Sequence, residues 1–283
     1  MDNCQPRCNP AKGSNAGLPL RFVQVGDIEL ALVDRGQGDP LVLVHAFPLD
    51  HALWSAQIES LAQTHRVIAP DLRGFGRSGV TAGTVTMSQM AQDLGRVLDA
   101  LQVRQPVTLA GISMGGYVAL AFWAALAARL RALILCDTRA AADPPQVSAG
   151  RLQTAERVER EGCHFLAEQM TPRLFAASTQ VQRPELVQRA RQTMLQAPPA
   201  GVAAASRGMA QREDMMARLG QIACPALLLA GAEDAVSTPA EMRAMAQAMP
   251  HAEFIEIAQA GHLSPLEQPE PVSRAMADFL AKL

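Results

Sequence analysis

The sequence predicts an α/β fold built on a mainly parallel sheet, and three observations support this. Short, continuous apolar runs alternate with helical patterns along most of the chain. Such runs are typical of strands that are buried on both faces. Two alternating segments around Gly26-Asp27 indicate an antiparallel hairpin before these runs. The chain has 283 residues, of which 49% are hydrophobic and 18% charged, and this composition suits a globular protein with a large core.

The order of the expected elements defines the layers of the fold. Apolar runs predict strands over residues 40–46, 66–71, 106–111, 131–137, 224–231 and 252–258. Helical patterns lie between or after them, over residues 52–63, 86–101, 115–130, 239–249 and 269–283. Because strands alternate with helices, we expect a parallel sheet with helices on both faces.

Two segments depart from this alternation. Residues 139–219 contain only helical patterns interrupted by prolines, which predicts a helical insertion between two strands of the core. The core then comprises residues 20–138 and 220–283. Residues 1–19 are polar and rich in Pro, Gly and Asn, so we expect a flexible tail.

Charge and cysteine content exclude several classes of protein. A formal net charge of −2 offers no basic surface for nucleic acid or an anionic membrane. We find neither an apolar run long enough for a membrane span nor the apolar centre of a secretory signal. The five cysteines are odd in number and scattered, which favours reduced thiols and a cytoplasmic protein.

The stretch Gly111-Ile112-Ser113-Met114-Gly115 lies between an expected strand and an expected helix. In this context the G-x-S-x-G pattern predicts a strained turn that exposes the Ser113 hydroxyl as a nucleophile. A glycine-rich turn without chemistry is the alternative.

A serine nucleophile needs a base and an acid, and these should follow it in the order acid, then histidine. Of six histidines only His262 follows the last expected strand, whereas His251 precedes that strand and His164 lies in the insertion. We therefore predict His262 as the base. Its alternative role is to cap the final helix.

Three carboxylates compete for the role of the acid. Asp234 and Glu233 follow the strand at residues 224–231, and Asp137 follows the strand at residues 131–137. We favour Asp234, with Asp137 as the second choice, and helix capping is the alternative role of Asp234.

An oxyanion also needs two donors. The Met114 N–H at the start of a helix is the first, and the Phe47 N–H in the loop after residues 40–46 is the second.

Taken together, these segments resemble the α/β-hydrolase superfamily, and within it the 3-oxoadipate enol-lactonase, arylesterase and cofactor-free haloperoxidase group. The resemblance rests on the motifs HAFPLDHALW, VIAPDLRGFGRSG, GISMGGYVAL, LCDTRA, LLLAGAEDAVSTP and AGHLSPLEQP. It implies a Ser113-His262-Asp234 triad, oxyanion donors at Phe47 and Met114, and a helical cap formed by the insertion. It implies a small-molecule ester or lactone substrate and requires no metal or organic cofactor.

One position departs from the family pattern. Where the family usually has His-Gly, this chain has His45-Ala46. We expect alanine either to shift the loop or to narrow the acyl side of the substrate site. An enol-lactonase would also need a cation for the substrate carboxylate. Arg139 is the candidate, unless it is only a surface arginine at a strand end.

Several activities fit the same residues. The principal hypothesis is hydrolysis of a carboxylic ester or lactone through an acyl-enzyme. An acyltransferase or a C–C bond hydrolase would use the same triad, and haloperoxidase or perhydrolase chemistry would be a side reaction. A non-catalytic ligand-binding receptor on this fold is the alternative from another class.

Overall fold

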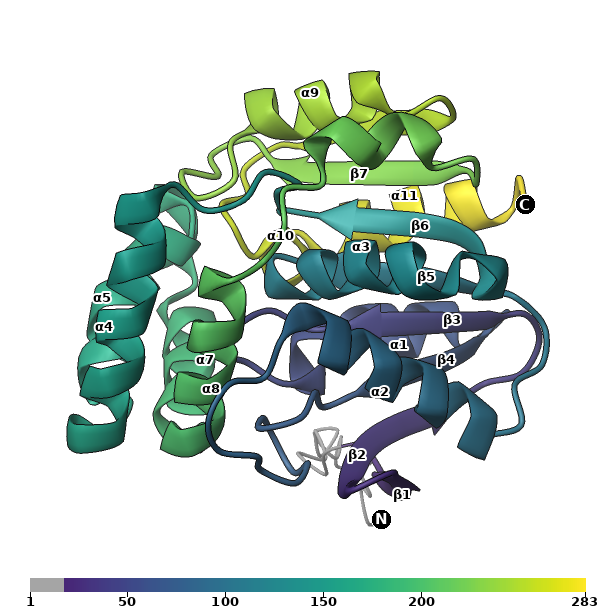
Figure 1. The fold of residues 1–283 in the computed structure, drawn as a ribbon. Coiled ribbons are helices and arrows are strands. Elements are labelled where there is room, and N and C mark those ends of the chain that lie inside the picture. The colour runs from purple at the N-terminus through teal and green to yellow at the C-terminus, as the bar shows by residue number, and fades with distance from the viewer. Residues whose placement is uncertain (1–17) are drawn as a thin grey trace, which may run out of the picture.

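The computed structural model describes residues 18–283, and their strands form one eight-stranded sheet (Figure 1). The strand order is β1-β2-β4-β3-β5-β6-β7-β8. The strands are β1 (Arg21–Val25), β2 (Ile28–Arg35), β3 (Pro40–Val44), β4 (Arg66–Pro70), β5 (Val107–Ile112), β6 (Leu130–Cys136), β7 (Ala226–Gly231) and β8 (Ala252–Ile257). The expected tail falls outside the described residues over 1–17.

The direction of the strands confirms the predicted topology. β1 and β2 form the antiparallel hairpin, in which Val25 pairs with Ile28 and Gly26 takes a φ of 64° in the turn. β2 is also antiparallel to β4, and every later pair in the sheet is parallel. The carboxyl ends of the parallel strands therefore meet at one edge of the sheet.

Helices cover both faces of the sheet. On β3, Leu41 and Leu43 pack into the core cluster that holds α1 and α11, whereas Val42 and Val44 pack into the cluster that holds α2, α3 and α9. The bounds are η1 (His51–Trp54), α1 (Ser55–Leu61), α2 (Met87–Ala100), α3 (Met114–Leu126), η2 (Ala127–Arg129), α9 (Pro239–Ala248), α10 (Ser264–Glu267) and α11 (Pro269–Leu280). Burial on both faces explains why these strands read as continuous apolar runs.

The expected burial of one strand is wrong. The run at residues 252–258 was expected to be a strand buried on both faces, but β8 lies at the edge of the sheet and most of its residues are at least partly exposed. An edge strand has a neighbour on one side only. The apolar content of a short run does not distinguish such a strand from a central one.

The part of the chain between β6 and β7 holds five α-helices and a short 3₁₀ helix, with no strand. They are α4 (Pro145–Glu161), α5 (His164–Leu174), α6 (Ala177–Gln182), α7 (Pro184–Gln196), α8 (Pro199–Ala210) and η3 (Met216–Gln221). Prolines begin α4, α7 and α8, where a missing N–H costs nothing. Pro172, expected to interrupt a helix, lies inside α5.

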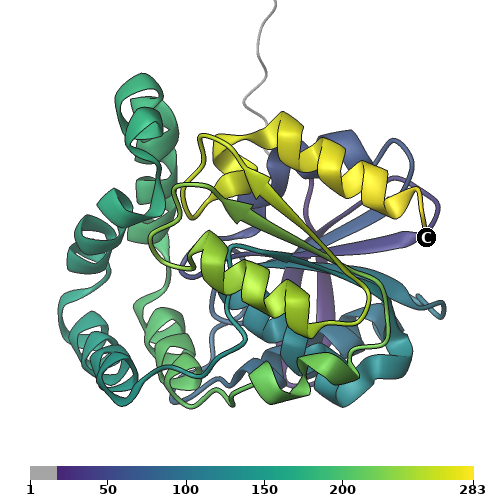
Figure 2. The same cartoon turned by 90° about the horizontal axis from the view of Figure 1, so that it is seen from above.

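Helices α4 to α8 lie beyond the carboxyl ends of the parallel strands, and both ribbon views agree on this (Figures 1 and 2). α4 and α8 pack against each other. The division of the chain into a core and a cap over residues 139–219 stays a prediction.

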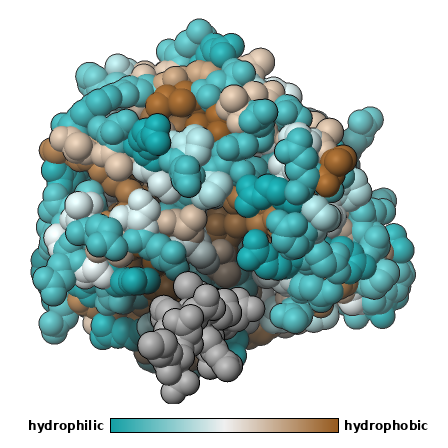
Figure 3. Space-filling view, turned by 180° about the vertical axis from the view of Figure 1, so that it is seen from behind, coloured by the Kyte–Doolittle hydropathy of each residue, from teal (hydrophilic) through white to brown (hydrophobic). Residues whose placement is uncertain are grey.

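The surface seen in Figure 3 is mainly hydrophilic, and hydrophobic residues form separate small patches on it. Within residues 18–283, no helix has the length and apolar character needed to cross a membrane.

Candidate active site

Ser113 lies in the tight turn between β5 and α3, as the motif predicts. Its φ of 53° and ψ of −115° place a non-glycine residue in a rarely occupied region, and the turn makes Ser113 the N-cap of α3. Hydrogen bonds to the end of β6 hold this conformation. The Ser113 N–H donates to the Cys136 carbonyl at 3.0 Å, and the Thr138 hydroxyl donates to the Ser113 carbonyl at 2.7 Å.

The two glycines of the motif allow close backbone contacts that no other residue would permit. A Cβ on Gly111 would lie 2.2 Å from the Gly115 carbonyl oxygen. A Cβ on Gly115 would lie 2.3 Å from the Val44 carbonyl oxygen at the end of β3. Because glycine has no Cβ, the start of α3 can pack against the loop that contains Phe47.

His262 lies between Ser113 and Asp234. Its Nε2 is 2.9 Å from the Ser113 Oγ, and its Nδ1 is 2.8 Å from the Asp234 Oδ2. Only 2% of His262 and 4% of Asp234 are exposed, so water weakens these hydrogen bonds little. As expected, the other two histidines are elsewhere: His251 precedes β8 at the opposite edge of the sheet, and His164 begins α5.

The structure separates the three candidate carboxylates. Asp234 contacts His262 with one oxygen, and its other oxygen accepts the N–H groups of Val236 and Ser237 at 2.7 and 3.0 Å. The side chain therefore orients the imidazole and also stabilises its own turn. The N-cap of α9 is Thr238, and Glu233 is exposed.

Asp137 is fully buried and has a different set of contacts. One oxygen accepts the Gly231 N–H at 2.7 Å, and the other accepts the Ser264 hydroxyl at 2.5 Å. These bonds connect the end of β6 to the segments that carry Asp234 and His262. Burial, together with the nearby charge of Asp234, raises the pKa of Asp137 to about 7.

We expect this raised pKa to appear in the pH dependence of stability. A carboxyl with a raised folded-state pKa stabilises the fold fully below its unfolded pKa of about 4, and the contribution is lost as pH rises through about 7. The Tm of the wild type should therefore fall relative to that of Asp137→Asn between pH 5 and pH 8. Thermal melts of both proteins measure this difference, and a constant gap would contradict the prediction.

The loop after β3 brings Phe47 to the same site. Within residues 18–283, neither the Phe47 N–H nor the Met114 N–H donates a hydrogen bond to another protein group. The Phe47-Pro48 peptide bond is cis.

Ala46 is buried and is not among the residues with positive φ, so this backbone accommodates alanine where the family usually has glycine.

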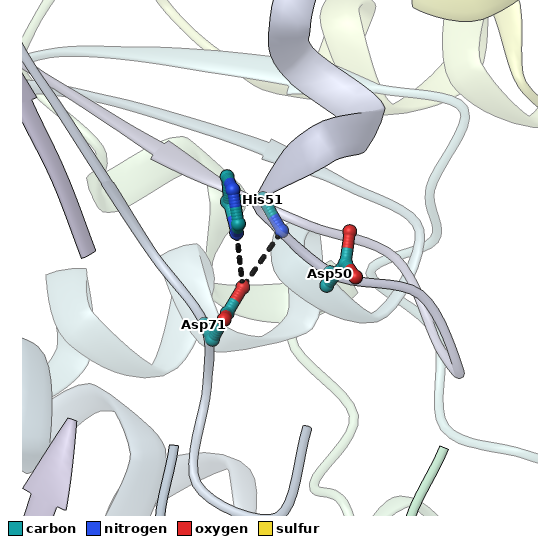
Figure 4. Close-up of side chains that lie close together, drawn as sticks. All are labelled: Asp50, His51 and Asp71. Atoms are coloured by element: carbon teal, nitrogen blue, oxygen red, sulfur yellow. Dashed lines mark hydrogen bonds and ion pairs between the residues drawn. The ribbon is translucent and has the colours of Figure 1, made fainter. Parts of the chain in front are cut away.

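Asp71 braces this loop together with His51 (Figure 4). One oxygen of Asp71 accepts two hydrogen bonds from His51. The backbone N–H of His51 donates at 2.9 Å, and its ring Nδ1–H donates at 2.7 Å. Burial alone would lower the pKa of His51, but the bond and charge of Asp71 outweigh it and raise that pKa. Asp50 lies close enough for the three to hold a cation, but it accepts the Ala52 N–H at 3.0 Å. Protein donors thus already occupy both Asp71 oxygens and one Asp50 oxygen.

A cavity of about 460 Å³ opens onto Ser113 and His262. Of the residues that the structure describes, three arginines and no carboxylate line it. Arg139 forms an ion pair with Glu241 at 3.2 Å, and Arg151 forms one with Asp143. Arg173, near the end of α5, has no ion-pair partner within the described part of the chain. The sequence analysis did not single out Arg173, because nothing in a helical pattern shows which side chain faces a cavity.

A second residue that the sequence analysis missed holds the His262 loop. The buried side chain of Glu267 accepts the Gly261 N–H and the Ala176 N–H, both at 2.8 Å. The Leu263 N–H adds a bond to the Leu174 carbonyl at 3.2 Å. The loop of His262 is thus joined to the segment between α5 and α6. A lone glutamate five residues after a histidine gives no signal of this role.

Comparisons with known proteins identify the family to which the chain is similar. Residues 39–269 match the family model of the alpha/beta hydrolase fold. 3-Oxoadipate enol-lactonase 1 of Acinetobacter baylyi is 30% identical over 243 residues, which is 86% of this chain and 89% of that protein. A malate-bound structure of a thermophilic esterase from Thermogutta terrifontis is 48% identical, with a TM-score of 0.91 over 93% of this chain and 98% of that one. The enol-lactonase of Burkholderia xenovorans is 29% identical, with a TM-score of 0.86 over 92% of this chain and 100% of that one.

Proposed function

This chain belongs to the alpha/beta hydrolase fold family, and we propose that it is a serine hydrolase that cleaves a carboxylic ester or lactone through an acyl-enzyme. The observation that carries the proposal is the continuous set of hydrogen bonds from Ser113 through His262 to Asp234. Relatives named as an enol-lactonase and an esterase support the choice of ester or lactone. Turnover of p-nitrophenyl acetate and p-nitrophenyl butyrate by the purified protein tests it.

The first half of the reaction forms the acyl-enzyme. The Ser113 Oγ attacks the substrate carbonyl carbon while the His262 Nε2 takes the hydroxyl proton. Asp234 keeps the other imidazole proton on Nδ1 and stabilises the cation that forms. The carbonyl oxygen becomes negative and accepts hydrogen bonds from the N–H groups of Phe47 and Met114. His262 then gives its proton to the departing alcohol oxygen.

The second half of the reaction repeats these steps with water. His262 removes a proton from a water molecule, whose oxygen attacks the acyl carbon. The same two N–H groups stabilise the second tetrahedral intermediate. When it collapses, the proton returns to the Ser113 Oγ and the acid is released. For a lactone the alcohol and the acid are ends of one molecule.

The helices of residues 139–219 act as a cap over this site. Met170 and Leu174 of α5 and Met209 of α8 line the cavity that contains Ser113 and supply apolar contacts for the substrate. Exclusion of water by the cap would strengthen the hydrogen bonds on which catalysis depends.

The charges around the cavity favour a substrate with an anionic group, and Arg173 is the residue whose charge is not already paired. We expect Arg173→Ala to raise the KM of an ester that carries a carboxylate by roughly tenfold, since a charged hydrogen bond is worth about 1.5–3 kcal/mol and partial exposure reduces it. The KM of a neutral ester of similar size should stay within about twofold. Steady-state kinetics on the two esters measure this.

Arg139→Ala is the matched control, because the sequence predicts Arg139 as the residue that binds a carboxylate. Because Glu241 already neutralises Arg139, its loss should affect the anionic ester less than the loss of Arg173. A larger effect at Arg139 would restore it as the carboxylate-binding residue. No effect at either position would remove the preference for an anionic substrate.

The related activities differ in the acceptor or in the bond broken. An acyltransferase would give a new ester when an alcohol is supplied, and a perhydrolase would give a peracid when peroxide is supplied. A C–C bond hydrolase would cleave a vinylogous diketone. The new ester and the peracid are distinguishable from the free acid, and C–C cleavage is recognised by the ketone fragment released beside its acid. Each product should disappear in Ser113→Ala.

A further inference from the structure

Tyr117 lies at the boundary between two cavities. It lies in the first turn of α3, four residues after the N-cap Ser113. Tyr117 lines the cavity that contains Ser113 and His262. Together with Arg139 it also lines a second cavity of about 390 Å³. Among residues 18–283, these two are the only ones that line both cavities, so they form the partition between them.

The second cavity is mainly apolar. It lies between the start of α2, the outer face of α3 and the end of α8, and its size exceeds the lower end of known ligand pockets, about 300 Å³. Small side chains on α3 leave this space unfilled, and longer apolar side chains close its ends. They are Ala121, Ala124 and Ala125, with Met87, Leu120 and Met215. These apolar walls suit an alkyl or aryl group. Of the charged residues that also line the cavity, Arg139 and Arg212 are in ion pairs with Glu241 and Asp143, and Glu213 is exposed.

Both parts of the partition are held in place. The Arg212 guanidinium lies over the Tyr117 ring, 4.3 Å from its centroid. Arg212 is in turn fixed by an ion pair with Asp143 at 2.6 Å and by a bond to the Ala141 carbonyl at 2.6 Å. Arg139 is tied to Glu241. The contact with the Arg212 guanidinium therefore fixes the position of the Tyr117 ring.

We propose that Tyr117 is a specificity-determining residue that limits the length of the apolar arm of the substrate. The ring closes the passage from the catalytic cavity into the second cavity. A short acyl group stays within the catalytic cavity, whereas the end of a long linear acyl chain can extend into the second cavity only when the ring is removed. This inference rests on the proposed esterase function, because the arm belongs to an ester bound at Ser113.

Tyr117→Ala tests the partition on p-nitrophenyl acetate, butyrate and octanoate. Removal of the ring should join the cavities and raise the octanoate-to-acetate ratio of kcat/KM by at least tenfold. Each methylene that gains burial contributes roughly fourfold, so burial of two or more suffices. Tyr117→Phe keeps the ring and should keep the wild-type ratio. An equal change for all three esters in Tyr117→Ala would overturn the proposal.

A second substitution locates the site of the gain. In the Tyr117→Ala background, Ala121→Trp fills the second cavity and should return the octanoate-to-acetate ratio to the wild-type value. If the gain survives, the chain does not enter that cavity and the proposal is wrong. Ser113→Ala in each background distinguishes a failure of the serine mechanism from a failure of the role proposed for Tyr117. Hydrolysis that Ser113→Ala does not lower would refute the serine mechanism, whereas Ser113-dependent hydrolysis with an unchanged ratio would refute only the role of Tyr117.

Discussion

Replacement of Ser113 with alanine is expected to lower kcat for p-nitrophenyl butyrate by roughly 10⁴ to 10⁶, as in other serine triads. The variant keeps the turn and the cavity but lacks the oxygen that attacks the carbonyl. Because 53° is an unfavourable φ for serine and alanine alike, its stability should change little. Burst and steady-state measurements on both proteins, with thermal melts as the control for folding, test this.

The other outcomes of this experiment are equally specific. Equal, rapid hydrolysis by both proteins would mean that Ser113 is not the nucleophile. A burst of product without steady turnover in the wild type would favour a ligand-binding receptor with a residual triad.

The second large effect is expected at Asp234. Asp234→Asn should lower kcat by about 10⁴, because an amide that donates to Nδ1 of His262 would place the imidazole proton on Nε2. The Nε2 atom could then no longer accept the proton of Ser113. The pH-rate profiles of wild type and variant measure the loss, and it should be largest near neutral pH.

Asp137→Asn is the matched control, since both carboxylates are buried and follow neighbouring strands. Asparagine can still accept the Gly231 N–H and donate to the Ser264 hydroxyl, so kcat should fall by no more than about tenfold. If Asp137→Asn were the more damaging of the two, the roles assigned to these acids would have to be exchanged.

The sequence by itself determined the parts of this protein that depend on local pattern. Apolar runs separated by helical patterns predict a parallel sheet with two covered faces, because period and burial are properties of neighbouring residues. Ser113 could be predicted in the same way, since its glycines lie two residues away. His262 followed from chain order, because only one histidine comes after the last strand.

The tertiary structure alone decided what depends on residues far apart in the chain. Asp137 and Asp234 both follow strands that end at the same edge of the sheet, and only the packing of the loops shows which one reaches His262. Three other features also depend on residues far apart in the chain. They are the exposure of β8, the position of Arg173 at the cavity and the contact between Tyr117 and Arg212. Periodicity assigns a side chain to a face of its own helix or strand. It does not show what that face meets, because this is set by contacts that form only when the chain has folded.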